Sequence, residues 1–200
     1  MDKFLGETQY VNFSEKNIKA KAEEIFFGLS GDEAKAKAAY EFVRDKIVHS
    51  FDIHSDCITA KASDVLKYKT GICHAKANLL AALLRSQKIP VGFCFQRLTL
   101  ADDDSNGYVV HCFNAVYLGT WVKVDARGNK PGVDARFSLD RPILAYPCRP
   151  EYDEYFWPGI YAAPHKDTML VLERAQNLQD VLTSLPDLIT SKPDIMEENI

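Results

Sequence analysis

The sequence lacks a basic stripe and has no strong excess of charge of either sign. Its 24 basic and 28 acidic residues give a formal net charge of -4 at pH 7, and they are spread along the 200 residues. Nucleic-acid binding usually requires a clustered basic surface. We therefore expect no nucleic-acid partner.

Long hydrophobic runs are also missing. Nowhere do 18 apolar residues follow one another without interruption, which is the length that a membrane-spanning helix needs. The first residues become charged again at Glu7, before an apolar run of signal-peptide length. We expect a soluble, cytoplasmic protein with no membrane partner.

Closely spaced cysteines are absent as well. The chain has an odd number of cysteines, widely spaced, and is too large to need disulfides for stability: Cys57, Cys73, Cys94, Cys112 and Cys148. Reduced thiols are the expected state. The sequence has no Cys-x-x-Cys pair and no His/Cys spacing typical of metal sites, so no metal or cofactor is expected.

One acidic segment resembles the first half of a calcium loop. Residues 102–107 read Asp-Asp-Asp-Ser-Asn-Gly, but the twelfth position of such a loop would be Phe113 instead of a bidentate glutamate. This segment is expected to be a solvated turn.

The chain shows no internal repeat, low-complexity tract or linker. Hydrophobic residues make up 46% of it, which is enough for one substantial core. We predict a single domain over residues 1–200, with a core at about 39–129 and a loop-rich and helical C-terminal extension at 130–200.

The first third of the chain predicts helices. Apolar residues recur at helical spacing over residues 14–29, and residues 30–33 resemble a helix stop followed by a capping box. A second helix should end near Val48. Residues 49–59 are polar and predict a loop, and residues 62–68 predict a short helix.

A central helix and an antiparallel hairpin follow. Residues 73–85 are rich in strong helix formers and start with Cys73, Pro90 ends this helical stretch, and residues 91–98 predict a strand. Residues 108–117 and 121–126 are β-rich runs about a Leu-Gly-Thr turn.

The remainder has a weaker pattern. Residues 128–164 hold most of the nine prolines and predict a long loop-rich segment, followed by one or two helices between residues 165 and 188 and a frayed tail from residue 192. The aromatic side chains of this segment are expected to pack onto the core. They are Tyr152, Tyr155, Phe156, Trp157 and Tyr161.

Cys73 is the candidate nucleophile, because it stands at the start of the central helix. The helix dipole contributes only about 0.3 to 1 kcal/mol, too little to ionise a thiol near neutral pH. An imidazolium about 4 Å away is worth about 4 kcal/mol at an effective dielectric constant near 20. A paired histidine is therefore the deciding requirement.

His111 is the best placed histidine, since it lies in a predicted strand and Asp125 follows on the partner strand. The other cysteines, and His54 and His165, are expected to be core or loop residues. If residues 118–120 form a three-residue loop, Phe113 faces Asp125, and His111 becomes the diagonal neighbour of Asp125 on the same face. A two-residue turn would point Asp125 away from His111.

The order of these motifs resembles the core of the transglutaminase-like superfamily. The motifs are Gly71-Ile72-Cys73 before an Ala/Leu helix, Leu83 to Pro90, His111-Cys112-Phe113-Asn114 and Trp121 to Asp125, with Tyr40 to Ile47 similar to the preceding helix. The resemblance implies a papain-like α+β fold, with N-terminal helices and the Cys-bearing helix on an antiparallel sheet. It implies that Cys73 is the nucleophile, His111 the general acid and base, and Asp125 the group that orients the imidazole.

The expected function is attack of the Cys73 thiolate on an amide carbonyl of a protein or peptide, through a thioester. Hydrolysis would make the protein a cysteine protease or amidase, and an amine acceptor would make it a transglutaminase. The one oxyanion donor that the sequence indicates is the backbone N–H of Cys73. The alternative is a catalytically inactive module that uses the fold to bind a protein or peptide.

Overall fold

The computed structural model describes residues 1–100 and 105–196, and these form an α+β fold. The helices are α1 (Lys16–Phe26), α2 (Asp32–Lys46), α3 (Ala62–Tyr68), α4 (Cys73–Ser86), α5 (Lys166–Arg174) and α6 (Leu178–Ser184). The strands are β1 (Val48–His49), β2 (Thr70–Gly71), β3 (Val91–Leu100), β4 (Ser105–Tyr117), β5 (Trp121–Val124) and β6 (Tyr155–Phe156). Three short 3-10 helices cover Asp2–Phe4, Ser50–Ile53 and Pro150–Tyr152.

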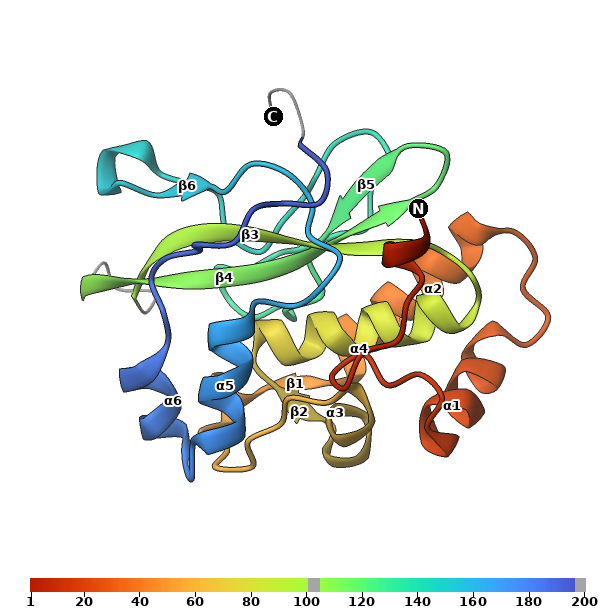
Figure 1. The fold of residues 1–200 in the computed structure, drawn as a ribbon, viewed down its shortest axis with the longest axis horizontal. Helices are drawn as coiled ribbons and strands as arrows, with labels where there is room; N and C mark the ends of the chain where they lie inside the picture. Colours follow the sequence, from red (N-terminus) through yellow and green to blue (C-terminus); the bar gives the residue numbers. More distant parts are fainter. Residues whose placement is uncertain (101–104, 197–200) are drawn as a thin grey trace.

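The main sheet has four strands in the order β5-β4-β3-β6, and all its pairings are antiparallel. The helices lie on one side of this sheet, with α4 directly beneath β3 and β4 (Figure 1). Helices α1, α2 and α3 pack against α4 from its other sides. The predicted arrangement, helices and a central Cys-bearing helix on an antiparallel sheet, is confirmed.

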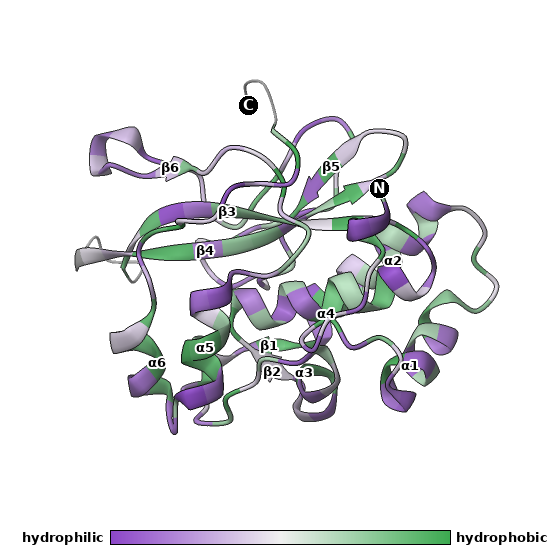
Figure 2. Ribbon diagram, in the orientation of Figure 1, coloured by the Kyte–Doolittle hydropathy of each residue, from purple (hydrophilic) through white to green (hydrophobic). Residues whose placement is uncertain are grey.

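Helix α4 is the centre of the core. Its leucines, Leu79, Leu80, Leu83 and Leu84, are fully buried, as its continuous Ala/Leu composition predicts. Burial of each leucine contributes about 1.5–3 kcal/mol to folding. In Figure 2 the hydrophobic residues follow β4 and the middle of α4, where these two elements face each other.

The opposite face of the sheet is covered by the two ends of the chain. Phe4 and Ile160 pack there against Phe113, and all three side chains are buried. Residue 160 also pairs with Ile195 through backbone hydrogen bonds of 2.8 and 3.1 Å. The prediction of fraying from residue 192 is therefore wrong up to residue 196, because backbone pairing holds this segment.

The β4–β5 hairpin has the register that the triad requires. Tyr117 faces Trp121 and Asn114 faces Val124, so the connection is the three-residue loop. Gly119 in this loop has a φ of +87°, a conformation that suits glycine. Continued by one residue, the register places Asp125 opposite Phe113.

Several local predictions need correction. Helix α2 starts after Gly31, whose φ is +83°, and no side chain caps it, so the predicted capping box at Ser30 does not form. Helix α1 is shorter than the predicted 14–29 stretch. The predicted 49–59 loop begins with the end of β1 and a 3-10 helix. Residues 102–104 of the acidic segment lie outside the described residues.

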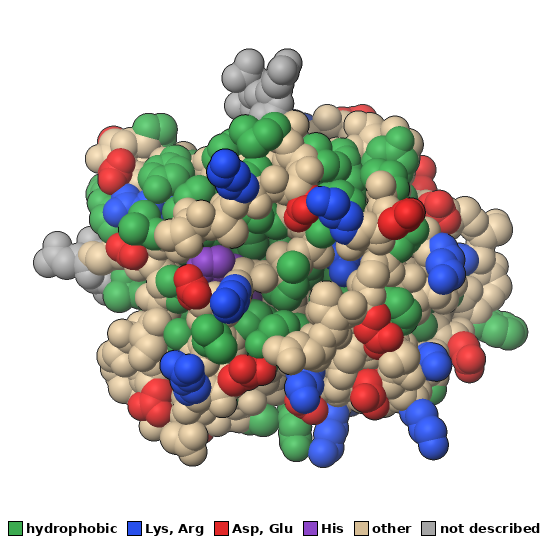
Figure 3. All heavy atoms as spheres, viewed as in Figure 1, with side chains coloured by type: hydrophobic (Ala, Val, Ile, Leu, Met, Phe, Trp, Pro, Cys, Tyr) green, Lys and Arg blue, Asp and Glu red, His purple; other side chains and the backbone are tan. Residues whose placement is uncertain are grey.

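The surface carries mixed charge. On the face shown in Figure 3, acidic and basic side chains are interspersed and no large area has one sign. Among residues 1–100 and 105–196, no helix has the length and apolar character needed to cross a membrane.

Candidate active site

Cys73 is the first residue of α4 and is partly exposed. The two-stranded parallel sheet β1–β2 leads directly to it, since His49 pairs with Gly71 two residues earlier. Cys94 and Cys112 are buried, and Cys57 and Cys148 are partly buried. Cys73 thus combines a helix N-terminus with access to solvent, which a nucleophilic thiol needs.

His111 and Asp125 are in direct contact. Nε2 of His111 lies 2.8 Å from Oδ2 of Asp125, and both side chains are buried. The carboxylate also accepts the backbone N–H groups of Arg127 and Ala145, each at 3.0 Å. Three donors therefore hold Asp125 in one orientation, and with it the imidazole.

The Cys73 thiol also favours the charged form of the His111 ring, through its charge and a hydrogen bond, and so raises the pKa of His111. Because Nε2 is engaged by Asp125, Nδ1 is the ring nitrogen left for the sulfur. Burial opposes the charged imidazolium, but Asp125 and Cys73 outweigh burial and raise the pKa of His111 to about 10. The predicted residues Cys73, His111 and Asp125 thus meet at one place in the fold.

Burial and the neighbouring groups shift the pKa of Asp125 in opposite directions. Removal from water raises the pKa of this carboxyl, but the His111 charge and the hydrogen bonds from His111, Ala145 and Arg127 lower it below its ordinary value. The carboxylate therefore stays ionised and favours the charged form of His111.

Two aromatic rings frame His111. The edge of Tyr146 meets the imidazole at a centroid distance of 5.4 Å and an angle of 89°, and Phe113 stacks at 6.4 Å. Phe113 comes from the same strand as His111, whereas Tyr146 comes from the loop-rich segment after β5. These contacts restrict the rotation of the imidazole.

A charged pair beside the triad was not predicted from the sequence. Arg127 binds Asp52 through two hydrogen bonds of 2.5 and 2.8 Å, and Lys130 approaches the same carboxylate at 3.3 Å. Burial raises the pKa of Asp52, but the Arg127 hydrogen bond holds it below its ordinary value. A basic residue two positions after the triad aspartate was the only local signal.

His49 was also missed. Its Nε2 accepts the backbone N–H of Cys73 at 3.1 Å, and the ring is 7% exposed. In the sequence this residue stands at the start of a polar stretch that predicts a loop, and nothing there indicates contact with Cys73. The predicted oxyanion donor is therefore engaged by a buried imidazole.

His74, the residue after Cys73, points to the sheet. Its Nε2 lies 2.8 Å from the Val110 carbonyl oxygen, and its ring stacks on Phe95. Burial lowers the pKa of His74 to about 3, so the ring is neutral. His165 lies outside the helices as predicted, directly before α5, and it is buried and contacts Thr168.

A cleft of about 630 Å³ opens over Cys73 and His111. One part of its wall is apolar and comes from the ends of β3 and β4 and from α6: Leu98, Leu100, Val109, Leu182 and Leu185. Another part carries the paired charges of Arg149 and Glu154, 2.8 Å apart. The C-terminal extension thus builds a large part of the cleft.

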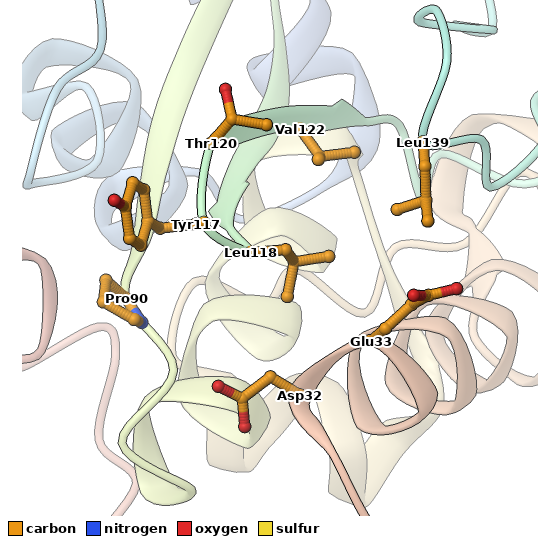
Figure 4. Close-up of a pocket in the computed structure, with 9 residues that line it drawn as sticks. Asp32, Glu33, Pro90, Tyr117, Leu118, Thr120, Val122 and Leu139 are labelled. Atoms are coloured by element: carbon orange, nitrogen blue, oxygen red, sulfur yellow. The ribbon is translucent and has the colours of Figure 1, made fainter.

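A second hollow of about 420 Å³ lies beyond the other end of α4 (Figure 4). Asp32 and Glu33 of α2 face the β4–β5 turn there, together with Leu139. In the part of the chain that the structure describes, no three His, Cys, Asp or Glu side chains come together in a cluster that could hold a metal ion.

The fold and the Cys-His-Asp arrangement define a papain-like α+β protein. Residues 19–126 match the model of the transglutaminase-like superfamily, which is more than half of the chain. The protein belongs to the transglutaminase-like superfamily. The family resemblance in the sequence is therefore confirmed.

A solved structure described as a putative cysteine protease from Cytophaga hutchinsonii is similar to this chain, with 21% sequence identity and a TM-score of 0.51. The match covers 62% of this chain and 40% of that one, so this chain corresponds to less than half of that protein. At this identity the likeness supports a shared fold. A comparison with curated proteins finds no match.

Proposed function

We propose that this protein is a cysteine hydrolase that cleaves amide bonds of proteins or peptides. One observation carries the proposal: Nε2 of His111 lies 2.8 Å from the Asp125 carboxylate, and His111 and the partly exposed Cys73 line the same cleft. This arrangement provides a nucleophile, a general acid and base, and a group that orients the imidazole.

In the acylation step, the Cys73 sulfur attacks the amide carbon and a C–S bond forms. The carbonyl electrons move to the oxygen and produce an oxyanion. When the oxyanion collapses, the C–N bond breaks, and the leaving amine takes the proton that the His111 imidazolium holds. A thioester on Cys73 results.

In the deacylation step, neutral His111 accepts a proton from water, and the resulting hydroxide attacks the thioester carbon. A C–O bond forms, the C–S bond breaks, and His111 returns the proton to the leaving thiolate or keeps it as imidazolium. An amine in place of water would complete a transglutaminase reaction.

The cleft supports a peptide-like substrate. Its apolar wall suits an aliphatic side chain, because burial of such a side chain is favourable without a charged partner. The description of the similar Cytophaga hutchinsonii protein as a putative cysteine protease agrees with hydrolysis.

The test is iodoacetamide labelling of each cysteine between pH 5 and pH 9, followed by peptide mapping. An ordinary thiol with a pKa of about 8.5 is roughly 0.3% ionised at pH 6. We expect Cys73 to react at pH 6 at least tenfold faster than Cys57 or Cys148, which are also partly exposed. His111→Gln should abolish this advantage, because the imidazolium partner is removed.

Circular dichroism of His111→Gln shows whether the variant is folded. Equal labelling of Cys73 and Cys148 in the wild type, indifferent to His111, would contradict the hydrolase. That result would favour the inactive binding module, which needs no activated thiol.

A further inference from the structure

We infer that Gln96 is a positioning residue for the triad. Its side-chain amide holds the segment of residues 145–148, and this segment, which we call the strap, in turn holds Asp125 and His111 in place. The inference rests on the proposed function and adds to it a buried side chain that acts through its neighbours.

The strap contacts two members of the triad. The backbone N–H of Ala145 donates to Oδ2 of Asp125 at 3.0 Å, and the same oxygen lies 2.8 Å from Nε2 of His111. The next residue, Tyr146, places the edge of its ring against the imidazole at a centroid distance of 5.4 Å. A displacement of the strap would therefore loosen the carboxylate and the imidazole together.

The strap has no helix or strand of its own. It lies in the loop-rich segment between β5 and β6. It also follows residue 126, where the match to the superfamily model ends. The position of the strap therefore depends on groups elsewhere in the fold that bind it.

Gln96 is one such group. Its Nε2 donates to the Tyr146 carbonyl oxygen at 2.9 Å and to Sγ of Cys148 at 3.3 Å. Gln96 lies in β3 directly opposite His111 in β4, and the two strands run side by side (Figure 1). Residues opposite each other in an antiparallel pair project from the same face of the sheet. Gln96 thus ties the strap to the sheet that carries His111.

The Gln96 side chain is not optimal for stability. It is 0% exposed, and its Oε1 has no hydrogen-bond partner among the described residues. A buried acceptor without a donor costs folding free energy. A methionine would fill nearly the same space without this cost, but it has no donor for the strap. A polar core residue that is kept despite such a cost is typical of a functional site.

The test is Gln96→Met in the full chain, with two probes of the strap. Iodoacetamide labelling measures the Cys148 thiol, which Gln96 contacts. Amide hydrogen exchange of Ala145 measures its bond to Asp125 and requires no turnover. We expect both rates to rise by roughly tenfold or more, because the strap opens more often without its anchor.

The consequence for the triad is measured by acylation of Cys73 with p-nitrophenyl acetate, which releases p-nitrophenolate. We expect kcat to fall by roughly 10- to 100-fold with KM within about twofold of wild type, because misplacement of the imidazole affects the reaction and not the cleft. The midpoint of thermal unfolding should stay within about 4 °C of wild type, since one buried unpaired acceptor is removed as the anchor is lost.

Gln96→Asn is a second variant that keeps an amide at this position. Its side chain is one methylene too short to reach both acceptors of the strap, so all rates should change in the same directions. The matched control is Gln87→Met, at the other end of α4 from Cys73, where the glutamine binds Lys35 at 3.1 Å. This control should leave the labelling, the exchange and the acylation unchanged.

Unchanged Cys148 labelling and Ala145 exchange in Gln96→Met would overturn the inference, and so would a strap that opens while kcat stays at the wild-type value. A kcat that falls only in proportion to the folded fraction would also overturn it. Failure of wild-type Cys73 to react with p-nitrophenyl acetate would instead overturn the proposed function.

Discussion

At the residue scale, the state of His111 depends on Asp125. The carboxylate is buried, ionised and held by three N–H donors, and its charge is what compensates the desolvation of the imidazolium. Without that charge, burial alone would lower the pKa of His111. The charge of Asp125, as distinct from its shape, therefore determines whether Cys73 has a cationic partner.

Asp125→Asn tests this dependence, because asparagine has nearly the same shape without the charge. We expect the pKa of His111 to fall from about 10 to below 6.5, and acylation of Cys73 at pH 7 to slow by roughly 10²-fold or more. NMR titration of His111 and p-nitrophenyl acetate kinetics measure the two effects. Asp134→Asn, at an exposed ion pair, is the control, and an unaltered His111 titration would refute the account.

At the scale of elements, a buried lysine connects α4 to the end of α2. Nζ of Lys76 donates to the Ile47 carbonyl oxygen and lies 3.5 Å from the Arg44 carbonyl oxygen, and the residue is fully buried. These carbonyls are at the C-terminus of α2, where the last backbone carbonyl groups have no N–H partner within the helix. Lys76 therefore supplies a hydrogen-bond donor to the backbone carbonyls at the end of α2, which packs against α4.

Lys76→Met should destabilise the protein by about 1–3 kcal/mol at pH 9, because it leaves buried carbonyls without a donor. Burial lowers the pKa of Lys76 from 10.5 to about 7. The folded state therefore binds fewer protons than the unfolded state between these values, and Lys76 contributes more stability as pH rises through that window.

The destabilisation by Lys76→Met should accordingly be smaller at pH 6 than at pH 9. Urea unfolding at both values measures it, and taking the difference from wild type cancels the titration of other groups. Lys37→Met, at an exposed position of α2, should show no such pH dependence. A loss that is equal at both pH values would refute the assigned titration.

At the scale of the whole molecule, one buried arginine joins segments that are far apart in the chain. The Arg85 guanidinium donates to the carbonyl oxygens of Gly6 at 2.7 Å, Val91 at 2.6 and 3.2 Å, and Ala162 at 2.7 Å. Burial lowers its pKa to about 10, so it remains charged at neutral pH. The end of α4 thereby connects the N-terminal segment, β3 and the C-terminal extension.

Arg85→Lys should destabilise the protein by about 2–4 kcal/mol, since an ammonium cannot match the planar fork and leaves at least one buried carbonyl without a donor. The free energy of unfolding in urea is the measurement. Arg174→Lys, at an exposed position in α5, should change it by less than about 0.5 kcal/mol. Equal stability of the two variants would show that the three-segment connection is unimportant.

Much of the fold was predictable because its signals are local. The Ala/Leu composition of residues 73–85 predicts a buried helix, and the side-chain period of two makes the hairpin register countable from the loop length. With a three-residue loop, which the structure has, that count places His111 and Asp125 on one face. The capping box failed because Gly31, with its positive φ, takes the N-cap position.

The sequence by itself thus determined the α+β class and the order of the main helices and strands, and it selected Cys73, His111 and Asp125 as the candidate triad. Only the tertiary structure decided that His49 meets the Cys73 N–H, that Arg127 pairs with Asp52, and that α6 lines the cleft. The physical reason is the distance along the chain over which each signal acts, because periodicity and turn chemistry act over only a few residues. These contacts instead join segments 24 residues apart or more, which are brought together by the burial of a shared core.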